Sequence, residues 1–134
     1  MYNRKILKVP HCVFSHCLDF MWKFHFIGFN GRPNKKDDTC YTWWVGAALK
    51  LLSQEDFVTD QIRSCIPYVL STQDPIVGGL AKWPELPPDP IHTYLGLSGL
   101  CLGKYQDLRP VDAELNISQR ARDFLDEMHN KKSW

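Results

Sequence analysis

The chain has 134 residues, of which 44% are hydrophobic, 13% aromatic and 23% charged, so it can bury a core and is not intrinsically disordered. The 16 Lys and Arg against 15 Asp and Glu leave a net charge of +1, which argues against a nucleic-acid-binding protein. No apolar stretch reaches the roughly 18 residues of a transmembrane helix. Five irregularly spaced cysteines and no export signal predict reduced thiols in a cytoplasmic protein, of one domain or one piece of a larger domain.

Residues 1–27 are basic and aromatic and have no clean helix or strand period. They contain two His-Cys pairs, His11-Cys12 and His16-Cys17, whose side chains could bind a metal. The spacing of these pairs matches no closed zinc site, and no second ligand pair follows at a suitable distance. We therefore interpret this segment as a loop or partly ordered leader, separate from a domain over residues 28–134.

From residue 28 onward the sequence predicts helices joined by loops. A first helix is expected over residues 40–52, because Trp44, Ala47 and Leu51 recur at helical spacing. The three residues that immediately precede this helix are all good N-caps: Asp37, Asp38 and Thr39.

A second helix is expected to follow at once. Ser53 and Asp56 resemble a capping box that opens it, and an apolar stripe continues from there. Pro67 lacks a backbone donor, so this helix should kink or end near residue 66.

The next segment, residues 71–90, is a loop of unusual length with five prolines, and loops of this length are often functional. Pro90 suits the first turn of a helix, which predicts a third helix over residues 91–102. Asn116 or Ser118 would cap a last, amphipathic helix. No strand pattern competes with these assignments, and the predicted fold is all-α.

Two parts of the chain align with each other when the sequence is shifted by 51 residues. Each part contains a glycine turn, a polar loop, an aspartate near a helix cap, and an apolar helix. The aligned pairs are Gly28 with Gly79, Phe29 with Leu80, Pro33 with Pro84, Asp38 with Asp89, Leu49 with Leu100, and Leu51 with Leu102. Repeats of this kind predict a stacked or radial array, and small residues such as Gly99 would let its helices pack closely.

The repeat also suggests a metal site. Asp38 and Cys40 stand at the start of one predicted helix, and His92 at the start of its equivalent. Because equivalent positions of an array face the same end, the three side chains can converge and supply zinc with three ligands and an open fourth position. A helix N-terminus should lower the pKa of the Cys40 thiol. In the plainer alternative, Asp38 is only a cap, Cys40 a small buried side chain, and His92 a core or surface histidine.

A candidate anion site lies beside these residues. Arg32 and Lys35 precede the same helix, and two cations at a helix N-terminus suit a phosphate-bearing anion, with a solvated turn as the alternative. Tyr41, Trp43 and Trp44 follow, so the cations would adjoin an aromatic wall that suits an amphiphile with an anionic head. The two Trp side chains lie on different sides of the helix, so at most one lines this wall.

Several stretches over about residues 28–120 together form a recognisable set of motifs. They are Gly31-Arg32-Pro33-Asn34-Lys35, Asp38-Thr39-Cys40-Tyr41 with Trp44, Ser71-Thr72-Gln73-Asp74, Gly78-Gly79-Leu80-Ala81-Lys82-Trp83-Pro84, and Asp89-Pro90-Ile91-His92-Thr93-Tyr94. This set resembles protein prenyltransferase β subunits. The Ser-Thr-Gln-Asp and Ala-Lys-Trp-Pro stretches favour the geranylgeranyltransferase type I β subunit. Tyr41-Thr42-Trp43-Trp44 and Asp89-Pro90 are closer to the Rab type.

The resemblance implies helical hairpins that form an incomplete portion of an (α/α)6 barrel, paired in a heterodimer with a prenyltransferase α subunit. It also implies roles for residues of this chain: zinc binding and catalysis for Asp38, Cys40 and His92, diphosphate binding for Arg32, Lys35 and Tyr41, and a place in the lipid pocket for Trp44.

The implied activity is transfer of a geranylgeranyl group from geranylgeranyl diphosphate to the cysteine thiol of a C-terminal CaaX protein, such as a small GTPase, with Zn²⁺ as cofactor. The chain would correspond to the carboxy-terminal part of such a subunit and would be inactive alone. The alternatives are a non-catalytic helical module that binds zinc or the α subunit, and a fragment of a Rab-type geranylgeranyltransferase β subunit.

Overall fold

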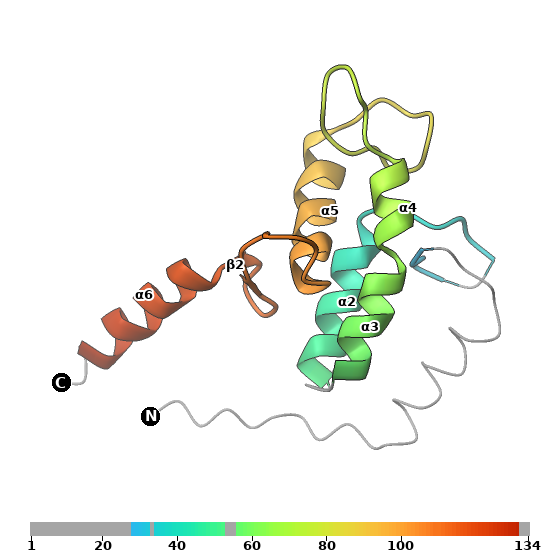
Figure 1. Cartoon of the computed structure of the whole chain (residues 1–134). Coiled ribbons are helices and arrows are strands. Elements are labelled where there is room, and N and C mark those ends of the chain that lie inside the picture. Colours follow the sequence, from blue (N-terminus) through green and yellow to red (C-terminus); the bar gives the residue numbers. More distant parts are fainter. Residues whose placement is uncertain (1–27, 33, 53–55, 132–134) are drawn as a thin grey trace.

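The structure, a computed structural model, describes residues 28–32, 34–52 and 56–131. Its elements are, in chain order, α2 (Tyr41–Leu52), α3 (Asp56–Ser64), α4 (Ile66–Ser71), α5 (Pro90–Leu102), β1 (Val111–Asp112), β2 (Ile117–Ser118) and α6 (Gln119–Lys131). Figure 1 shows α2, α3 and α5 side by side, with α4 continuing beyond α3, whereas α6 projects away. No helix in the described part of the chain is long and apolar enough to cross a membrane.

Two short strands are the exception to the predicted all-α fold. β1 and β2 pair in antiparallel fashion over two residues each. Asp112 closes the turn between them, because its Oδ1 accepts the backbone N–H groups of Glu114 and Leu115 at 3.0 and 2.8 Å. A pairing this short is too brief for the alternation by which strands are predicted, so the sequence did not indicate it.

The helices begin and end close to the predicted positions. Pro90 stands in the first turn of α5, as expected. Pro67 stands in the first turn of α4, so the interruption predicted near residue 66 is confirmed as the break between α3 and α4. Ser53, one half of the predicted capping box, and the two His-Cys pairs of residues 1–27 lie outside the described residues.

The two predicted repeat copies share a backbone contact. The N–H of Asp38 donates to the carbonyl of Phe29 at 2.9 Å, and the N–H of Asp89 donates to the carbonyl of Leu80 at 3.3 Å. Phe29 and Leu80 are both buried. Since aligned residues form the same hydrogen bond, the shift of 51 residues relates the two copies in three dimensions as well as in sequence.

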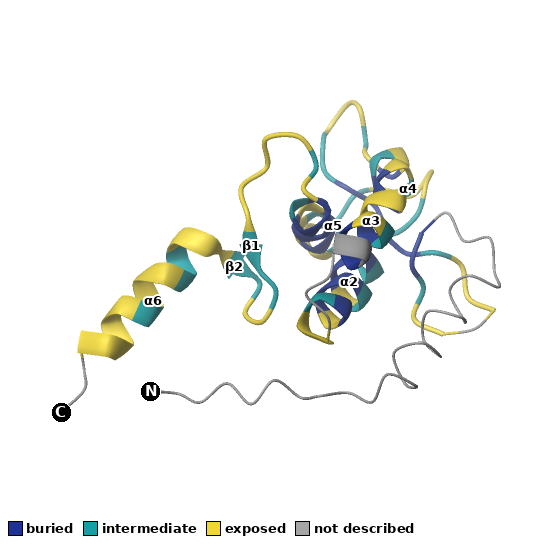
Figure 2. Cartoon of the chain, turned by 60° about the horizontal axis from the view of Figure 1, so that its bottom comes forward, coloured by how far each residue is buried: buried dark blue, intermediate teal, exposed yellow. Residues whose placement is uncertain are grey.

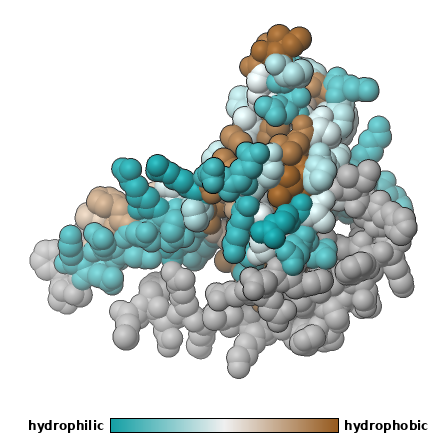
Figure 3. Space-filling model, viewed as in Figure 1, coloured by the Kyte–Doolittle hydropathy of each residue, from teal (hydrophilic) through white to brown (hydrophobic). Residues whose placement is uncertain are grey.

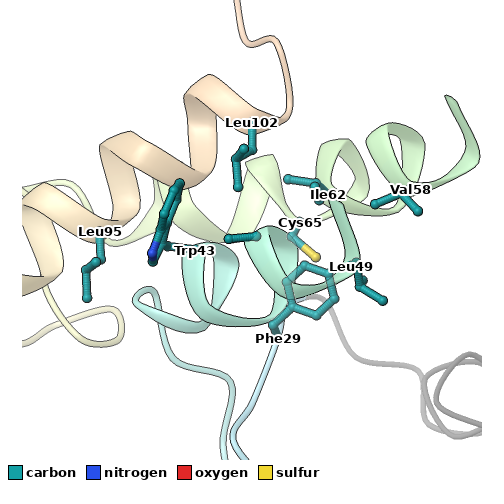
Figure 4. Close-up of a cluster of buried hydrophobic side chains, with 9 residues drawn as sticks. Phe29, Trp43, Leu49, Val58, Ile62, Cys65, Leu95 and Leu102 are labelled. Atoms are coloured by element: carbon teal, nitrogen blue, oxygen red, sulfur yellow. The ribbon is translucent and has the colours of Figure 1, made fainter. Parts of the chain in front are cut away.

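The larger apolar core lies where α2, α3 and α5 meet, and Figure 2 shows the buried residues gathered between these helices. Figure 4 labels most of its members: Phe29, Trp43, Leu49, Val58, Ile62, Cys65, Leu95 and Leu102. Trp43 is 5% exposed and Trp44 is 55% exposed, so the two Trp side chains lie on different sides of α2, as predicted.

The helices α2 and α5 approach each other closely because glycine occupies the contact. A Cβ on Gly99 would lie 2.6 Å from Cγ2 of Thr42, and a Cβ on Gly96 would lie 2.7 Å from Cγ2 of Thr39. A larger side chain at either glycine therefore forces the helices apart. This contact brings the N-terminal ends of α2 and α5 together, where the candidate site residues lie.

The last helix keeps its apolar face exposed. Ser118 caps α6, since its Oγ accepts the N–H of Ala121 at 3.3 Å, which settles the predicted choice between Asn116 and Ser118. Phe124 and Met128 are exposed, and no residue of α6 is buried (Figure 2).

A second exposed apolar feature is the tip of the loop after α4. Ile76 and Val77 are 92% and 76% exposed, and Figure 3 shows hydrophobic atoms at the top of the molecule, where this loop reaches furthest in Figure 1. Oδ1 of Asp74 accepts the N–H groups of both residues at 2.8 and 2.9 Å. The carboxylate therefore holds the apolar tip in a tight turn.

Candidate metal and anion site

The structure brings the three predicted metal ligands together at the N-terminal ends of α2 and α5. One ligand atom from each of Asp38, Cys40 and His92 lies within 4.8 Å of the other two. Cys40 and His92 are 52 residues apart in the sequence. Asp38 is buried, while Cys40 and His92 are partly buried. The close approach of α2 and α5 is what allows this convergence.

Asp38 is fixed by the start of α2. Its Oδ1 accepts the N–H of Cys40 at 3.0 Å, and its carbonyl accepts the N–H of Tyr41 at 3.0 Å. The same Oδ1 lies 3.3 Å from Nε2 of His92. Capping and metal binding, weighed as alternatives for Asp38, are therefore compatible in one conformation of this side chain.

His92 is held by a carboxylate that the sequence analysis did not name as a site residue. Its Nδ1 lies 2.6 Å from Oδ2 of Asp89, while Oδ1 of Asp89 accepts the N–H groups of Ile91 and His92 at 2.9 and 3.0 Å. The hydrogen bond from the backbone N–H of His92 is the main cause that lowers the pKa of Asp89, helped by the imidazole. Asp89 thus caps α5 with one oxygen and directs Nε2 of His92 toward Asp38 with the other.

Metal-binding histidines usually donate their second ring N–H to a carboxylate or carbonyl, which fixes the tautomer and orients the ring. The spacing Asp-x-x-His at a helix start was a signal for this contact, because residues three apart share a helix face. From the sequence, Asp89 was predicted to be a repeat-related cap and part of a family motif, with no role toward the metal.

The predicted lowering of the Cys40 pKa is wrong. Burial raises the pKa of this thiol from 9.0 to about 12, and the hydrogen bond and negative charge of Asp38 act in the same direction. Partial positive charge at a helix N-terminus favours a thiolate, but here it is outweighed by desolvation and by the carboxylate two residues away.

A pocket of about 520 Å³ adjoins Asp38 and is formed by the loops that precede α2 and α5. Its lining residues are Gly31, Arg32, Asn34, Lys35, Lys36, Asp38, Tyr41, Lys82 and Trp83. The structure therefore places Arg32, Lys35 and Tyr41, the residues expected to bind a diphosphate, in one pocket. Lys36 and Lys82 add two further cations, which sequence reasoning missed because nothing local indicates that the two loops meet.

Asp38 belongs to both the ligand set and the pocket. Its Oδ2 lies 3.7 Å from Nζ of Lys82, and Lys82 is part of the pocket wall. Trp44 lies outside this pocket, on the exposed side of α2. The candidate metal site and the cationic pocket are therefore directly adjacent, with one carboxylate shared between them.

The donor set fits zinc. Two ligand atoms that each lie about 2.0–2.2 Å from a tetrahedral zinc ion are roughly 3.3–3.6 Å apart. The distance of 3.3 Å between Nε2 of His92 and Oδ1 of Asp38 agrees with this. Carboxylate, thiol and imidazole are the side-chain groups that zinc binds most often, and three protein ligands are the number found in catalytic sites.

Comparison with known protein families agrees with this architecture. The family model "Prenyltransferase alpha-alpha toroid domain" matches residues 4–117. The chain therefore belongs to the prenyltransferase alpha-alpha toroid family, and the predicted α/α barrel hairpins are confirmed. Because the match begins at residue 4, it includes most of the segment interpreted as a leader, and the division at residue 28 stays a prediction.

Individual relatives are geranylgeranyl transferase β subunits of two types. The chain is 39% identical over 99 residues to the geranylgeranyl transferase type-1 subunit beta of Dictyostelium discoideum, covering 74% of this chain and 28% of that protein. It is 38% identical over 85 residues to the type-2 subunit beta of Saccharomyces cerevisiae, covering 63% of this chain and 26% of that protein. The chain thus spans about a quarter of the length of these relatives.

A solved structure shows the same fold. The Candida albicans protein geranylgeranyltransferase-I complexed with GGPP matches with a TM-score of 0.67 and 28% sequence identity. The match covers 81% of this chain and 32% of that chain. Over the matched part, the helical arrangement of the chain is therefore similar to that of this solved structure.

Proposed function

We propose that the chain provides the zinc-binding and diphosphate-binding part of a protein geranylgeranyltransferase type I β subunit, acting in the cytoplasm with a prenyltransferase α subunit. The reaction would transfer a geranylgeranyl group from geranylgeranyl diphosphate to the cysteine of a C-terminal CaaX protein. The thiol releases its proton to solvent, the C1–S bond forms, the C1–O bond breaks, and diphosphate leaves with the bonding electrons. The observation that carries the proposal is the convergence of Asp38, Cys40 and His92 beside a cationic pocket.

Asp38, Cys40 and His92 would hold the zinc ion, which when bound would accept the substrate thiol as a thiolate. Asp89 would keep the proton of His92 on Nδ1 through the contact of 2.6 Å and leave Nε2 free to bind metal. The N–H of Cys40 would hold Oδ1 of Asp38 in place through the contact of 3.0 Å.

Arg32, Lys35 and Tyr41 would bind the diphosphate in the pocket that they line. As the C1–O bond breaks, negative charge grows on the departing diphosphate, and donors already aimed at it stabilise the transition state. Trp44, exposed on α2, would contact the isoprenoid chain. The shared Asp38 would keep the thiol and the diphosphate within reach of each other.

The test combines this chain with the remaining β-subunit sequence of a relative and with an α subunit. We expect Arg32→Ala and Lys35→Ala each to slow the chemical step by about tenfold to a thousandfold, the effect of removing one electrostatic stabiliser. Peptide affinity should stay nearly unchanged. Asp38→Ala should do the reverse and impair zinc and thiol binding while leaving lipid diphosphate binding largely intact.

Single-turnover rates and separate titrations of lipid and peptide distinguish the two sets of residues. Arg109→Ala, which removes an exposed cation outside the pocket, is the matched control. If Arg32→Ala and Lys35→Ala leave both lipid binding and the chemical step at the level of this control, the loop is a solvated turn and the proposal is wrong.

A second candidate is the β subunit of a Rab-type geranylgeranyltransferase, which the Saccharomyces cerevisiae type-2 relative favours. The same reconstituted enzyme distinguishes the two, because type I activity requires a CaaX peptide and the Rab type would leave that peptide unmodified. A complex that binds zinc and the α subunit but modifies neither a CaaX peptide nor a Rab protein would instead identify the chain as a non-catalytic module.

A further inference from the structure

The ring of Trp83 lies close to two ammonium groups. Nζ of Lys82 is 4.9 Å and Nζ of Lys36 is 5.6 Å from the ring centroid. Both distances lie within the range of about 6 Å over which an ammonium group is attracted to an aromatic face. Lys36 precedes α2 and Lys82 precedes α5, so the ring joins cations from both loops that form the pocket.

The backbone that carries this ring is anchored to buried residues. The carbonyl of Lys82 accepts the N–H of Thr39 at 3.0 Å and the hydroxyl of Thr39 at 3.1 Å. The N–H of Ala81 donates to the carbonyl of Thr72 at 2.9 Å. Thr39, Thr72 and Ala81 are all buried. The backbone that leads into Trp83 is therefore held in place, and its ring offers a surface on which two otherwise flexible lysine side chains can be ordered.

The positive charges of the pocket are poorly neutralised. Asp38 is the one acidic side chain of its lining, and it pairs with Lys82 and contacts His92. Within the part of the chain that the structure describes, Arg32, Lys35 and Lys36 have no ion-pair partner. Two ammonium groups near one ring also repel each other, so an anion bound beside them stabilises this half of the pocket.

The number of cations in the pocket indicates how many phosphoryl groups its anion has. Arg32 and Lys35 are enough for one phosphoryl group, since each donates charge-assisted hydrogen bonds. Lys36 and Lys82 supply a second pair, held on Trp83. A diphosphate has a second phosphoryl group to offer to this second pair, whereas a monophosphate has none.

We propose that Trp83 is a positioning residue that presents Lys36, together with Lys82, to the second phosphoryl group of a diphosphate, and so makes the pocket prefer a diphosphate over a monophosphate. This inference rests on the proposed function, because it concerns the same anion pocket. It adds Lys36 and Trp83 to the residues that would bind the diphosphate.

The test titrates the same reconstituted complex with pyrophosphate and, separately, with inorganic phosphate by calorimetry, with chelator present. We expect Lys36→Gln to weaken pyrophosphate binding by about tenfold, the loss of one charge-assisted contact, and phosphate binding by less than about threefold. Trp83→Leu should weaken pyrophosphate binding by about three- to tenfold, and Trp83→Phe, which keeps a smaller ring, by less.

Two further variants make the test specific. In the double variant Lys36→Gln with Trp83→Leu, the losses should be less than additive, because Trp83 acts partly through Lys36. Lys104→Gln removes an exposed cation outside the pocket and should leave both affinities unchanged. Lys36 is itself exposed, so Lys36→Gln tests the proposal even if Trp83→Leu unfolds the chain.

The outcomes separate this inference from the proposed function. A reconstituted complex that carries the wild-type chain and does not bind pyrophosphate contradicts the proposed function. Pyrophosphate binding that Arg32→Gln weakens, but that either Lys36→Gln or a folded Trp83→Leu leaves unchanged, overturns the inference alone. Equal losses for phosphate and pyrophosphate in Lys36→Gln also overturn it, because a pocket that selects a diphosphate cannot lose both to the same extent.

Discussion

The two copies of the repeat each have an aspartate at the equivalent position, and the two aspartates have different roles. Asp38 and Asp89 form equivalent backbone hydrogen bonds, and each accepts backbone N–H groups at a helix start. The side chain of Asp38 is 9% exposed and contacts the side chains of both His92 and Lys82, whereas the side chain of Asp89 is 41% exposed and, among the ion pairs of the described residues, contacts the imidazole of His92. One position of the repeat thus provides a candidate ligand, and its equivalent orients another.

The comparison extends to the residues around each aspartate. The first copy contributes Cys40 and most of the cationic loop, while the second contributes His92 together with Lys82 and Trp83. Neither copy holds a complete site. The site therefore depends on how closely α2 and α5 approach each other, and the predictions that follow test the contribution of each copy.

The largest effect should come from removing a candidate ligand. Cys40→Ala and His92→Ala should each lower zinc affinity by more than about a hundredfold, because loss of a ligand costs more than loss of an orienting residue. Competition with a chromophoric chelator measures the affinity.

Cys101→Ala is the matched control, since this half-buried cysteine of α5 is outside the ligand cluster and should keep full zinc affinity. Zinc that survives both ligand changes but is lost in the double variant Cys12→Ser/Cys17→Ser would place the metal in residues 1–27 and contradict the prediction.

The second effect concerns the orienting aspartate of the second copy. Asp89→Asn keeps an oxygen that can cap α5, but its amide donates to Nδ1 of His92 and shifts the ring proton to Nε2. Because Nε2 is then protonated, it cannot bind metal, and zinc affinity should fall by about ten- to a hundredfold. ¹⁵N chemical shifts of His92 report the tautomer independently of the metal.

Asp74→Asn makes the same chemical change at an aspartate that lies in a different turn, and it should leave zinc affinity unchanged. If Asp89→Asn alters neither the tautomer nor the affinity, Asp89 is only a helix cap.

Much of this arrangement could be predicted from the sequence. The aligned pairs of the repeat related Asp38 to Asp89, and they placed His92 at a helix start equivalent to that of Cys40. Helix ends were also predictable, because Pro67 and Pro90 restrict the backbone locally. Local chemistry and periodicity carry this information, and neither depends on the rest of the fold.

Other features depend on distant parts of the chain. The pKa of Cys40 is raised mainly by burial, which its neighbours in sequence do not report. Lys36 and Lys82 share a pocket wall only because the backbone at Lys82 hydrogen-bonds to Thr39, 43 residues away. The pairing of β1 with β2 is too short for a periodic signal. Tertiary contact decides each of these features.

The third effect tests the contact between the copies. Gly99→Ala places a Cβ 2.6 Å from Cγ2 of Thr42 and 3.2 Å from its backbone carbonyl carbon. Overpacking of this kind costs about 1–3 kcal/mol, and the better helix propensity of alanine offsets about 1 kcal/mol of it. We expect a net loss of about 1 kcal/mol in the free energy of unfolding, measured by urea denaturation.

The control for this change is in the other helix of the pair. Gly46→Ala on α2 places a Cβ 3.3 Å from Cδ1 and Cγ1 of Ile62 and 3.5 Å from Cδ1 of Leu102, and these nearest atoms all belong to side chains. Small side-chain shifts relieve these contacts, so the gain in helix propensity should leave stability nearly unchanged. If Gly46→Ala and Gly99→Ala lower the free energy of unfolding equally, the loss in Gly99→Ala does not come from the close contact between Gly99 and Thr42.

The smallest effect concerns the turn that leads into the second copy. The N–H groups of Val77 and Ile76 lower the pKa of Asp74 below its ordinary value of 3.8. A depressed pKa means that the turn is stabilised above pH 3.8 and loses this stabilisation as the pH falls through the lower value of the folded state. The amide shifts of Ile76 and Val77 should therefore titrate below pH 3.8 in the wild-type chain and stay constant in Asp74→Asn, whose side chain does not ionise. Titration that persists in Asp74→Asn would assign the transition to another carboxylate.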